Sequence, residues 1–359
     1  MDVPLFTLPD LVEAARDGRS EPIQQLDQVC RELGVFRLVE LGLPTGLLSG
    51  MLARTRELFA LPIEVKRGLR YSEDQFVGWR GADDNLNEYG YADHKEMFHI
   101  GPRVSSTLGA AGAAGAAGPA GSGDGAADSD VLADGAVLAD GAVLADWARS
   151  AAADRTLWQA VLPHFVLAWH RYYAAMQRAA AGLGEALSAA AGVPYASWAS
   201  MTEGNWADLA ANFYPAQAAG APPRMRNAVH SDLTLFTILL QDPPGPGGLV
   251  MRDRAGDWHD VVPAAGEFVV NVGELLTYLT GGAWWAVPHE VRPVVPALTG
   301  DRLSIPFFFR PHDARILAPF RVGPDTDQFD TDLSDTGGAA SLDVGAWVRA
   351  RKLKQHAVS

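Results

Sequence analysis

The feature of this sequence that most constrains its fold is a change in hydrophobic period after about residue 205. From there on, short runs rich in β-branched and aromatic residues follow one another, and turns rich in proline and glycine separate them. These turns read PPGPGG at 243–248, GD at 256–257 and PAAG at 263–266. Short strands at regular spacing are typical of an antiparallel sandwich or barrel. We therefore predict a mainly β core with flanking α-helices.

The residues before this β-rich half alternate between helical and extended patterns. Ser20-Glu21-Pro22 is a typical helix start, Gly34 a typical helix end, and Val35–Val39 has the character of a short strand. Further along, apolar residues recur at i, i+3, i+4 spacing, which predicts an amphipathic helix that backs a sheet. These residues are Leu162, Phe165, Val166, Trp169, Tyr173 and Met176. A last helix is predicted over 343–355, with cationic residues towards its C-terminal end.

One segment has too few apolar side chains to fold. In the stretch 109–127, sixteen of nineteen residues are Gly or Ala, so burial there does not offset the entropy of ordering the backbone. We expect a mobile surface insertion. The patterns divide the chain into an N-terminal α+β region (1–103), an Ala/Gly/Asp-rich insertion (104–150), supporting helices (151–204), the β core (205–320), and a C-terminal tail with a helix (321–359).

Charge and cysteine content limit the partners and the compartment. With 29 Lys+Arg against 43 Asp+Glu, the formal net charge is −14, which disfavours binding to nucleic acid. The single cysteine, Cys30, cannot form an intramolecular disulfide, and its apolar neighbours predict a buried thiol. No stretch has the length and apolar character of a signal peptide or a membrane span. We expect a soluble, cytoplasmic protein that binds neither nucleic acid nor a membrane.

A candidate metal site lies within the β-rich half. His230 and Asp232 are two residues apart, and on a strand such residues point to the same face. His289 follows in a later β-type segment and supplies a third ligand. Two imidazoles and one carboxylate on one face of an ion form the triad of non-haem Fe(II) sites, which leaves coordination positions open. We therefore predict a metal held by these three side chains.

Two further pairs of residues are suited to binding a carboxylate. Arg302 and Ser304 share one face of a predicted strand, where a guanidinium and a hydroxyl together form a carboxylate clamp. Upstream, Asn212 and Tyr214 place an amide and a phenol on another strand face. Both groups are able to bond a carboxylate or a metal-bound keto acid.

The order of these motifs resembles the isopenicillin N synthase-like family of Fe(II)/2-oxoglutarate-dependent oxygenases. The order is Asn212-Phe213-Tyr214-Pro215, His230-Ser231-Asp232, His289 and Arg302-Leu303-Ser304. The resemblance extends over further segments and leaves out only about residues 104–150. These segments are 34–36, 59–66, 78–79, 95–96, 233–242, 247–249 and 266–273.

The resemblance implies a double-stranded β-helix, a distorted jelly-roll, with iron held by His230, Asp232 and His289. It also implies that 2-oxoglutarate chelates the iron through its keto-acid end. The far carboxylate of 2-oxoglutarate would then pair with Arg302 and bond Ser304 and Tyr214, while Asn212 assists near the metal. With O₂ as the oxidant, a small molecule of specialised metabolism would be oxidised, by hydroxylation as the default and by desaturation or cyclisation as variants.

Candidate substrate-lining residues come from two places in the chain. One is the segment that covers the mouth of such sites in the family, and the other follows the Arg302 strand. From these we predict Phe76, Trp79, Arg80, Tyr91, Phe98 and Phe309.

Three other functions compete with this one. An iron oxidase of the isopenicillin N synthase type works without 2-oxoglutarate, but that enzyme has a substrate-binding arginine where this chain has Phe76. A zinc hydrolase would use the same three ligands, yet it would leave Arg302 and Ser304 without a task. A non-catalytic binding barrel is expected to have lost part of the triad, which is intact here.

Overall fold

The computed structural model describes most of the chain outside the low-complexity region. The described residues are 3–71, 77–82, 93–100, 163–217, 224–242, 247–293, 300–320 and 341–356. The insertion predicted at 104–150 lies outside them, and so does the stretch 321–340 of the predicted tail.

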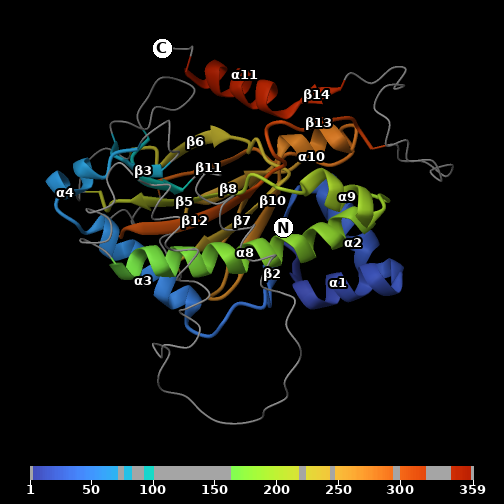
Figure 1. Cartoon of the computed structure of the whole chain (residues 1–359), viewed down its shortest axis with the longest axis horizontal. Helices are drawn as coiled ribbons and strands as arrows, with labels where there is room; N and C mark the ends of the chain where they lie inside the picture. Colours follow the sequence, from blue (N-terminus) through green and yellow to red (C-terminus); the bar gives the residue numbers. More distant parts are fainter. Residues whose placement is uncertain are drawn as a thin grey trace, which may run out of the picture.

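An eight-stranded sheet forms the larger wall of the molecule (Figure 1). Its strand order is β1-β2-β10-β7-β12-β5-β4-β3, and every neighbouring pair is antiparallel except β1 with β2. The strands are β1 (Leu5–Thr7), β2 (Val35–Val39), β3 (Val77–Arg80), β4 (Glu96–Ile100), β5 (Asp208–Tyr214), β7 (Phe236–Gln241), β10 (Phe268–Val272) and β12 (Arg302–Phe309). Because β1 to β4 come from the N-terminal region, that region and the β-rich half share one sheet.

A four-stranded antiparallel sheet forms the smaller wall, in the order β6-β11-β8-β9. Its strands are β6 (Asn227–His230), β8 (Leu249–Arg252), β9 (Trp258–Asp260) and β11 (His289–Val291). Side chains from both sheets line one cavity, so the two sheets face each other. A separate two-stranded pair joins β13 (Ile316–Leu317) to β14 (Leu342–Asp343). The predicted double-stranded β-helix with flanking helices is confirmed.

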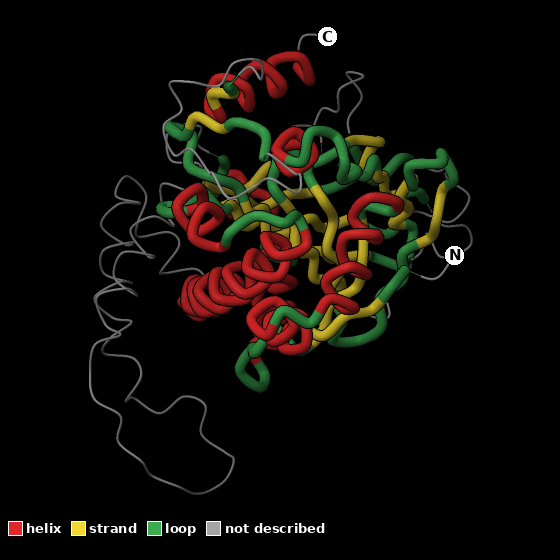
Figure 2. Tube along the Cα trace, turned by 90° about the vertical axis from the view of Figure 1, so that its right-hand side faces the viewer, coloured by secondary structure: helices red, strands yellow, loops and turns green. Residues whose placement is uncertain are grey.

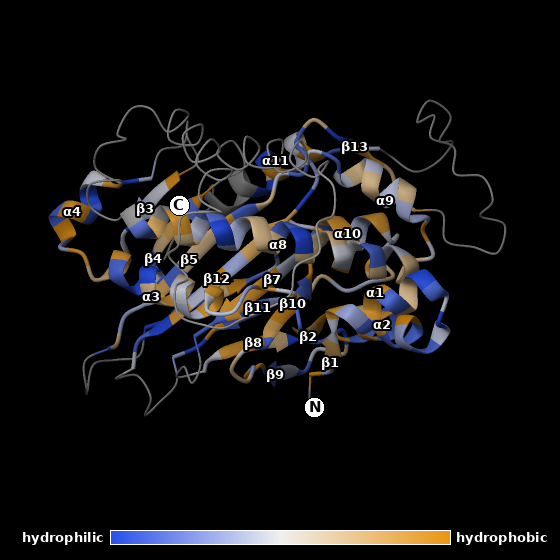
Figure 3. Ribbon diagram, turned by 60° about the horizontal axis from the view of Figure 1, so that its bottom comes forward, coloured by the Kyte–Doolittle hydropathy of each residue, from blue (hydrophilic) through white to orange (hydrophobic). Residues whose placement is uncertain are grey.

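The helices flank these sheets. They are α1 (Leu8–Asp17), α2 (Ser20–Glu32), α3 (Leu47–Phe59), α4 (Ile63–Gly68), α8 (Pro163–Ala190), α9 (Tyr195–Thr202), α10 (Glu274–Leu279) and α11 (Val344–His356). The long helix α8 runs across the large sheet (Figure 1), as the amphipathic pattern predicts. The view turned by 90° shows helices packed around the strands (Figure 2). Tyr173 of α8 packs against Phe307 of β12, with ring centres 5.5 Å apart. Hydrophilic colouring marks the outer turns of α1 and α2, away from the packed interior (Figure 3).

The predicted start of the chain's second helix and the strand after it are both present. α2 begins at Ser20 and ends at Glu32, and Gly34 then adopts a left-handed conformation with φ of 67°. A Cβ at Gly34 would lie 2.1 Å from the carbonyl oxygen of Trp285, so both the backbone angle and the close approach require glycine. The chain then enters β2 directly. Cys30 is fully buried and unpaired, as predicted.

None of the helices in the described ranges is both long and apolar enough to span a bilayer.

Candidate active site

The three predicted metal ligands meet at one end of the smaller sheet. His230 is the last residue of β6, and His289 is the first residue of β11. The antiparallel register pairs these two residues directly, so their rings lie side by side with centres 4.2 Å apart. Asp232 lies beyond the end of β6, in the connection to β7. The expectation that His230 and Asp232 share a strand face is therefore corrected, since the chain leaves the strand after His230.

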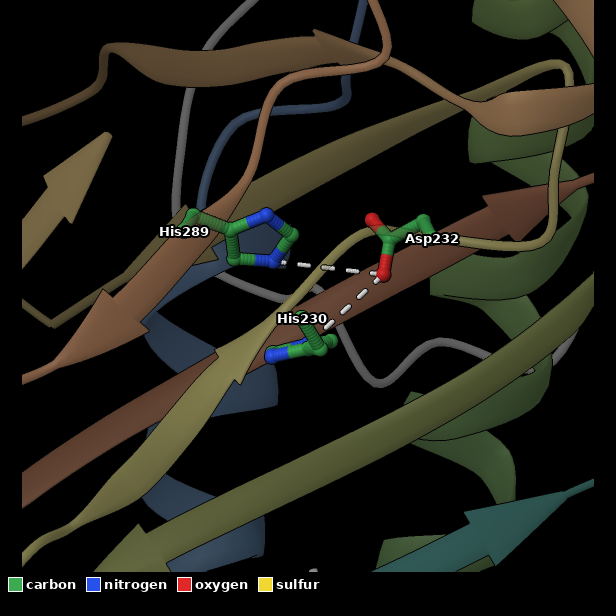
Figure 4. A group of neighbouring side chains, drawn as sticks. All are labelled: His230, Asp232 and His289. Carbon is green, nitrogen blue, oxygen red and sulfur yellow. Dashed lines mark ion pairs between the residues drawn. The ribbon is translucent and has the colours of Figure 1, made fainter. Parts of the chain in front are cut away.

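The ligand atoms converge on a common point (Figure 4). Oδ1 of Asp232 lies 3.9 Å from Nε2 of His230 and 3.9 Å from Nε2 of His289. All three ligand atoms lie within 4.8 Å of one another, a spacing that a single ion can bridge. In the described part of the chain, no other group of three His, Cys, Asp or Glu residues meets this condition.

The hydrogen bonds of both imidazoles fit a bound metal. Nδ1 of His230 lies 2.8 Å from the carbonyl oxygen of Ala228, and Nδ1 of His289 lies 3.1 Å from that of Val287. Because a carbonyl only accepts, each Nδ1 carries the hydrogen and donates it. Each Nε2 therefore has its lone pair free towards the centre, the tautomer that a metal requires.

The carboxylate of Asp232 is held from behind. The Thr237 hydroxyl donates to its Oδ2 at 2.6 Å, and Nδ2 of Asn271 donates to the same atom at 2.9 Å. Oδ1 is left to face the imidazoles. Sequence reasoning missed both supporting residues, although Asn271 is the one polar residue within the buried strand Phe268–Val272. A polar side chain in such a strand was the signal that could have found it.

Electrostatics keeps His230 and Asp232 in the protonation states that a metal needs. Burial and the neighbouring His289 lower the pKa of His230 to about 4, against the opposing effect of Asp232. Burial works to raise the pKa of Asp232, but the two imidazoles and the hydrogen bonds from Thr237 and Asn271 outweigh it and leave that pKa below its ordinary value. At neutral pH His230 is a neutral imidazole and Asp232 an anion, which are metal-binding forms.

The predicted carboxylate clamp opens into the same cavity as the triad. Register pairs Arg302 with Tyr214 and Ser304 with Asn212 across β12 and β5, and all four residues line the cavity. Nη1 of Arg302 donates to the Ser304 hydroxyl at 3.1 Å, and Nη2 donates to Oε1 of Gln241. Burial lowers the pKa of Arg302, while Tyr214 acts in the opposite direction. A buried guanidinium thus points into the space that the metal ligands also face.

Strand alternation decides which aromatic residues reach the cavity. The even-numbered residues of β12, from Arg302 to Phe308, line it. The register pairs Trp79 with Phe98 and Phe98 with Ala211. Ala211 is the neighbour of the cavity-lining Asn212 in β5, so alternation turns Ala211 away from the cavity. Trp79 and Phe98 therefore point to the opposite face of the sheet. There Phe98 packs edge-on against the α8 residues Phe165 and Trp169.

The same alternation corrects the prediction for Phe309. Phe309 stacks on Phe236 with ring centres 4.9 Å apart and is buried in the core, whereas Phe308 lines the cavity. Trp79, Phe98 and Phe309 were predicted to line the substrate site, but they pack on the face of the large sheet that points away from the cavity. The two-residue alternation that places Arg302 and Ser304 on the cavity face also places Pro306 and Phe308 there.

The remaining substrate-lining predictions have separate outcomes. Arg80 shares the sheet face of Met97 and Asn212, with its guanidinium 3.9 Å from the ring centre of Tyr71, but it is not among the residues that line the cavity. Phe76 and Tyr91 lie outside the described residues.

Removing the support of Asp232 is expected to weaken the metal site. Asn271→Ala and Thr237→Val each delete one hydrogen bond to Oδ2 and free the carboxylate to turn, so we expect metal affinity to fall by roughly 10- to 100-fold. Equilibrium dialysis with Mn(II) measures this directly. Thr277→Val is the matched control, because its hydroxyl donates to the carbonyl of Gly273, the N-cap residue of its own helix, and not to Asp232. Unchanged affinity in both support variants would show that Asp232 needs neither partner.

Two family models match this chain. The model described as the N-terminal part of the non-haem dioxygenase in morphine synthesis matches residues 3–113. The model of the 2OG-Fe(II) oxygenase superfamily matches residues 206–311, which include all three triad residues and Arg302.

Curated relatives include enzymes from fungi, plants and bacteria. A 2-oxoglutarate-Fe(II) type oxidoreductase of Metarhizium rileyi is 33% identical over 42% of this chain and 41% of its own length. The first relatives are thus matched over less than half of their length. Flavone synthase of Petroselinum crispum is 26% identical over 89% of this chain and 74% of its own length. Validamycin A dioxygenase of Streptomyces hygroscopicus is 26% identical over 88% and 79%.

Solved structures with the same fold cover nearly the whole chain. Neurospora crassa T7H, crystallised with alpha-KG and thymine, has a TM-score of 0.69 at 16% identity over 97% of this chain and 96% of its own. The rice dioxygenase for auxin oxidation has a TM-score of 0.63 at 21% identity over 98% and 95%. One family model covers the N-terminal region and a second covers the core with the triad, so that, as the motif order predicts, the chain belongs to the 2OG-Fe(II) oxygenase superfamily.

Proposed function

We propose that this protein is an Fe(II)/2-oxoglutarate-dependent dioxygenase that oxidises a small organic molecule of specialised metabolism, with hydroxylation as the default outcome. The observation that carries the proposal is a single cavity lined at once by the triad and by the buried clamp of Arg302, Ser304, Tyr214 and Asn212. A metal site alone fits several chemistries, but a metal facing a buried guanidinium fits a co-substrate with a chelating end and a charged end.

Each group then has one task. His230, Asp232 and His289 hold Fe(II) on one side and leave positions open on the other. Bound iron supplies the redox chemistry that couples O₂ and 2-oxoglutarate to oxidation of the substrate. Arg302 would pair with the far carboxylate of 2-oxoglutarate, and Ser304 and Tyr214 would donate hydrogen bonds to it. Asn212, two residues before Tyr214 on β5, would assist near the metal. The apolar lining residues Leu239, Leu249, Met251 and Val291 keep water from the charged groups.

The relatives support a small-molecule substrate. Their names describe a flavone synthase, a scopoletin 8-hydroxylase and a validamycin A dioxygenase. Desaturation and cyclisation share the same site, because the position of the substrate decides among these outcomes. A cytoplasmic location belongs to the proposal too, since a buried unpaired cysteine suits a reducing compartment.

Anaerobic titration of the metal-free protein tests the proposal. Fe(II) is added first and 2-oxoglutarate second, while the visible metal-to-ligand charge-transfer band of the chelate is followed. We expect the band to saturate, and aerobic turnover to release succinate. If iron bound without a band, the 2-oxoglutarate-independent oxidase would replace this proposal. If iron did not bind, zinc hydrolysis or simple ligand binding would do so.

Two adjacent phenylalanines are expected to respond differently to truncation. Phe309→Ala opens a hole in the core and should lower the free energy of unfolding by about 3–5 kcal/mol. Phe308→Ala removes a side chain that lines the cavity, so it should cost less stability and should change the rate of succinate release instead. Urea unfolding and succinate assays on both variants give the comparison. Equal loss of stability in the two variants would contradict the assigned orientation of β12.

A further inference from the structure

Arg226 is a buried cation just outside the cavity wall. It immediately precedes β6, and its neighbour Asn227 lines the cavity. Its side chain is fully buried, and Nη2 donates to the carbonyl oxygen of Gly300 at 2.9 Å. Nε and Nη1 are also buried, and neither has a hydrogen-bond partner within the described ranges. Two strong donors on a buried, charged group therefore have no acceptor among the described residues.

A second guanidinium lies near this one. Gly300 and Asp301 lead directly into Arg302 at the start of β12, so the bond to Gly300 ties Arg226 to the clamp end of the cavity. Burial first, and then the like charge of Arg302, lower the pKa of Arg226, against the opposing effects of Tyr214 and Asp301. Asp301 is itself half-exposed and bonds Arg56 at 2.9 Å.

Buried cations without an anion are unfavourable in a folded protein. Arg226 and Arg302 form no ion pair with a carboxylate in the described part of the chain, although both are almost completely shielded from water. Buried charges in proteins are ordinarily paired, so a bound anion is a natural source of the missing charge. The nearest space for an anion is the cavity end where Tyr214 and Ser304 already offer hydroxyls.

We propose that Arg226 is a second cationic residue of this subsite, which together with Arg302 selects a 2-oxo acid with a far carboxylate over one that lacks it. The inference rests on the proposed function and adds a residue to it. Arg302 touches the ligand directly, whereas Arg226 acts from behind the cavity wall through its charge. It is therefore a specificity-determining residue rather than a catalytic one.

The test compares two co-substrates that share the chelating end. 2-Oxoglutarate carries the far carboxylate, and 2-oxobutyrate does not, so only the first should sense the charge of Arg226. Both are titrated anaerobically into the Fe(II) protein, and the charge-transfer band gives each Kd. The variants are Arg226→Met, which keeps the length and removes the charge, and Arg226→Lys, which keeps the charge. Arg224→Gln is the matched control, since Arg224 is exposed and two residues away.

We expect Arg226→Met to raise the Kd of 2-oxoglutarate by roughly 10- to 100-fold and that of 2-oxobutyrate by less than about threefold. Arg226→Lys should recover most of the loss, and Arg224→Gln should bind like the wild type. An equal loss for both acids, or no loss for 2-oxoglutarate, would overturn the inference. A wild-type protein that forms no band with either acid would instead remove the proposed function itself.

The ligand-free protein provides a second readout. A residue that merely supports the fold would lower the melting temperature when replaced. An uncompensated buried charge should do the opposite, so we expect Arg226→Met to melt at or above the wild-type temperature without ligand and to gain less from 2-oxoglutarate. A variant that melts clearly lower, or that does not fold, would contradict the inference, because the charge would then serve the fold.

Discussion

Replacing Asp232 by alanine is expected to abolish Fe(II) binding, with a loss of affinity of more than about 100-fold, and turnover with it. The substitution removes the one carboxylate of the triad, whose Oδ1 lies 3.9 Å from both Nε2 atoms. It also leaves the Thr237 hydroxyl and the Asn271 amide without their shared acceptor, so a moderate fall in stability should accompany the loss. Two imidazoles alone, without the carboxylate, would hold the ion weakly.

Metal content after equilibrium dialysis, measured by mass spectrometry, gives the result for Asp232→Ala. Asp260→Asn serves as the control, because Asp260 is an exposed carboxylate at the end of β9 and lies far from the triad in the sheet. If the alanine variant folded and retained one iron per chain with unchanged affinity, the metal would have to be held by other residues.

Replacing Arg302 by alanine is expected to leave Fe(II) affinity unchanged and to weaken the binding of 2-oxoglutarate by about 2–5 kcal/mol. Arg302 lies on the large sheet, whereas His230 and His289 lie on the small one, so the substitution leaves the ligand geometry in place. What it removes is the buried guanidinium that the far carboxylate would meet beside Ser304 and Tyr214. The charge-transfer titration separates the two effects, since Fe(II) is added before the co-substrate.

A matched arginine on the surface controls for the loss of charge. Arg292 is partly exposed and pairs with Glu290, and Arg292→Ala should leave both affinities unchanged. Arg302→Ala with wild-type affinity for 2-oxoglutarate would show that the clamp residues serve another purpose, and the oxidase alternative would then gain support.

Much of the site could be predicted because its residues obey local rules. Arg302 with Ser304 and Asn212 with Tyr214 are pairs at i and i+2, and β alternation alone places each pair on one face. Pairing of β5 with β12 then brings the two faces together. The helix that backs the sheet was equally local, since its apolar spacing extends over several turns.

What could not be predicted depends on contacts between distant segments. The segment that holds Trp79 and Phe98 has the right composition for a pocket wall, but only its register with β5 decides which face each ring takes. Asp232 shares a pattern with strand residues, yet the chain turns out of the strand before it. The unpaired nitrogens of Arg226 are a property of everything packed around them. None of these features can be read from the spacing of residue types along the sequence.

The two walls of the cavity have a consequence for the motions of the protein. The histidine ligands belong to one sheet and Arg302 to the other, so a ligand that chelates the metal and reaches Arg302 joins the two sheets like a removable cross-link. Local opening of the smaller sheet then becomes harder while the ligand stays bound. The amide hydrogens of β6 and β11 should therefore exchange more slowly with solvent deuterium when 2-oxoglutarate is present. Their exchange rates would record co-substrate occupancy without turnover and without knowledge of the substrate.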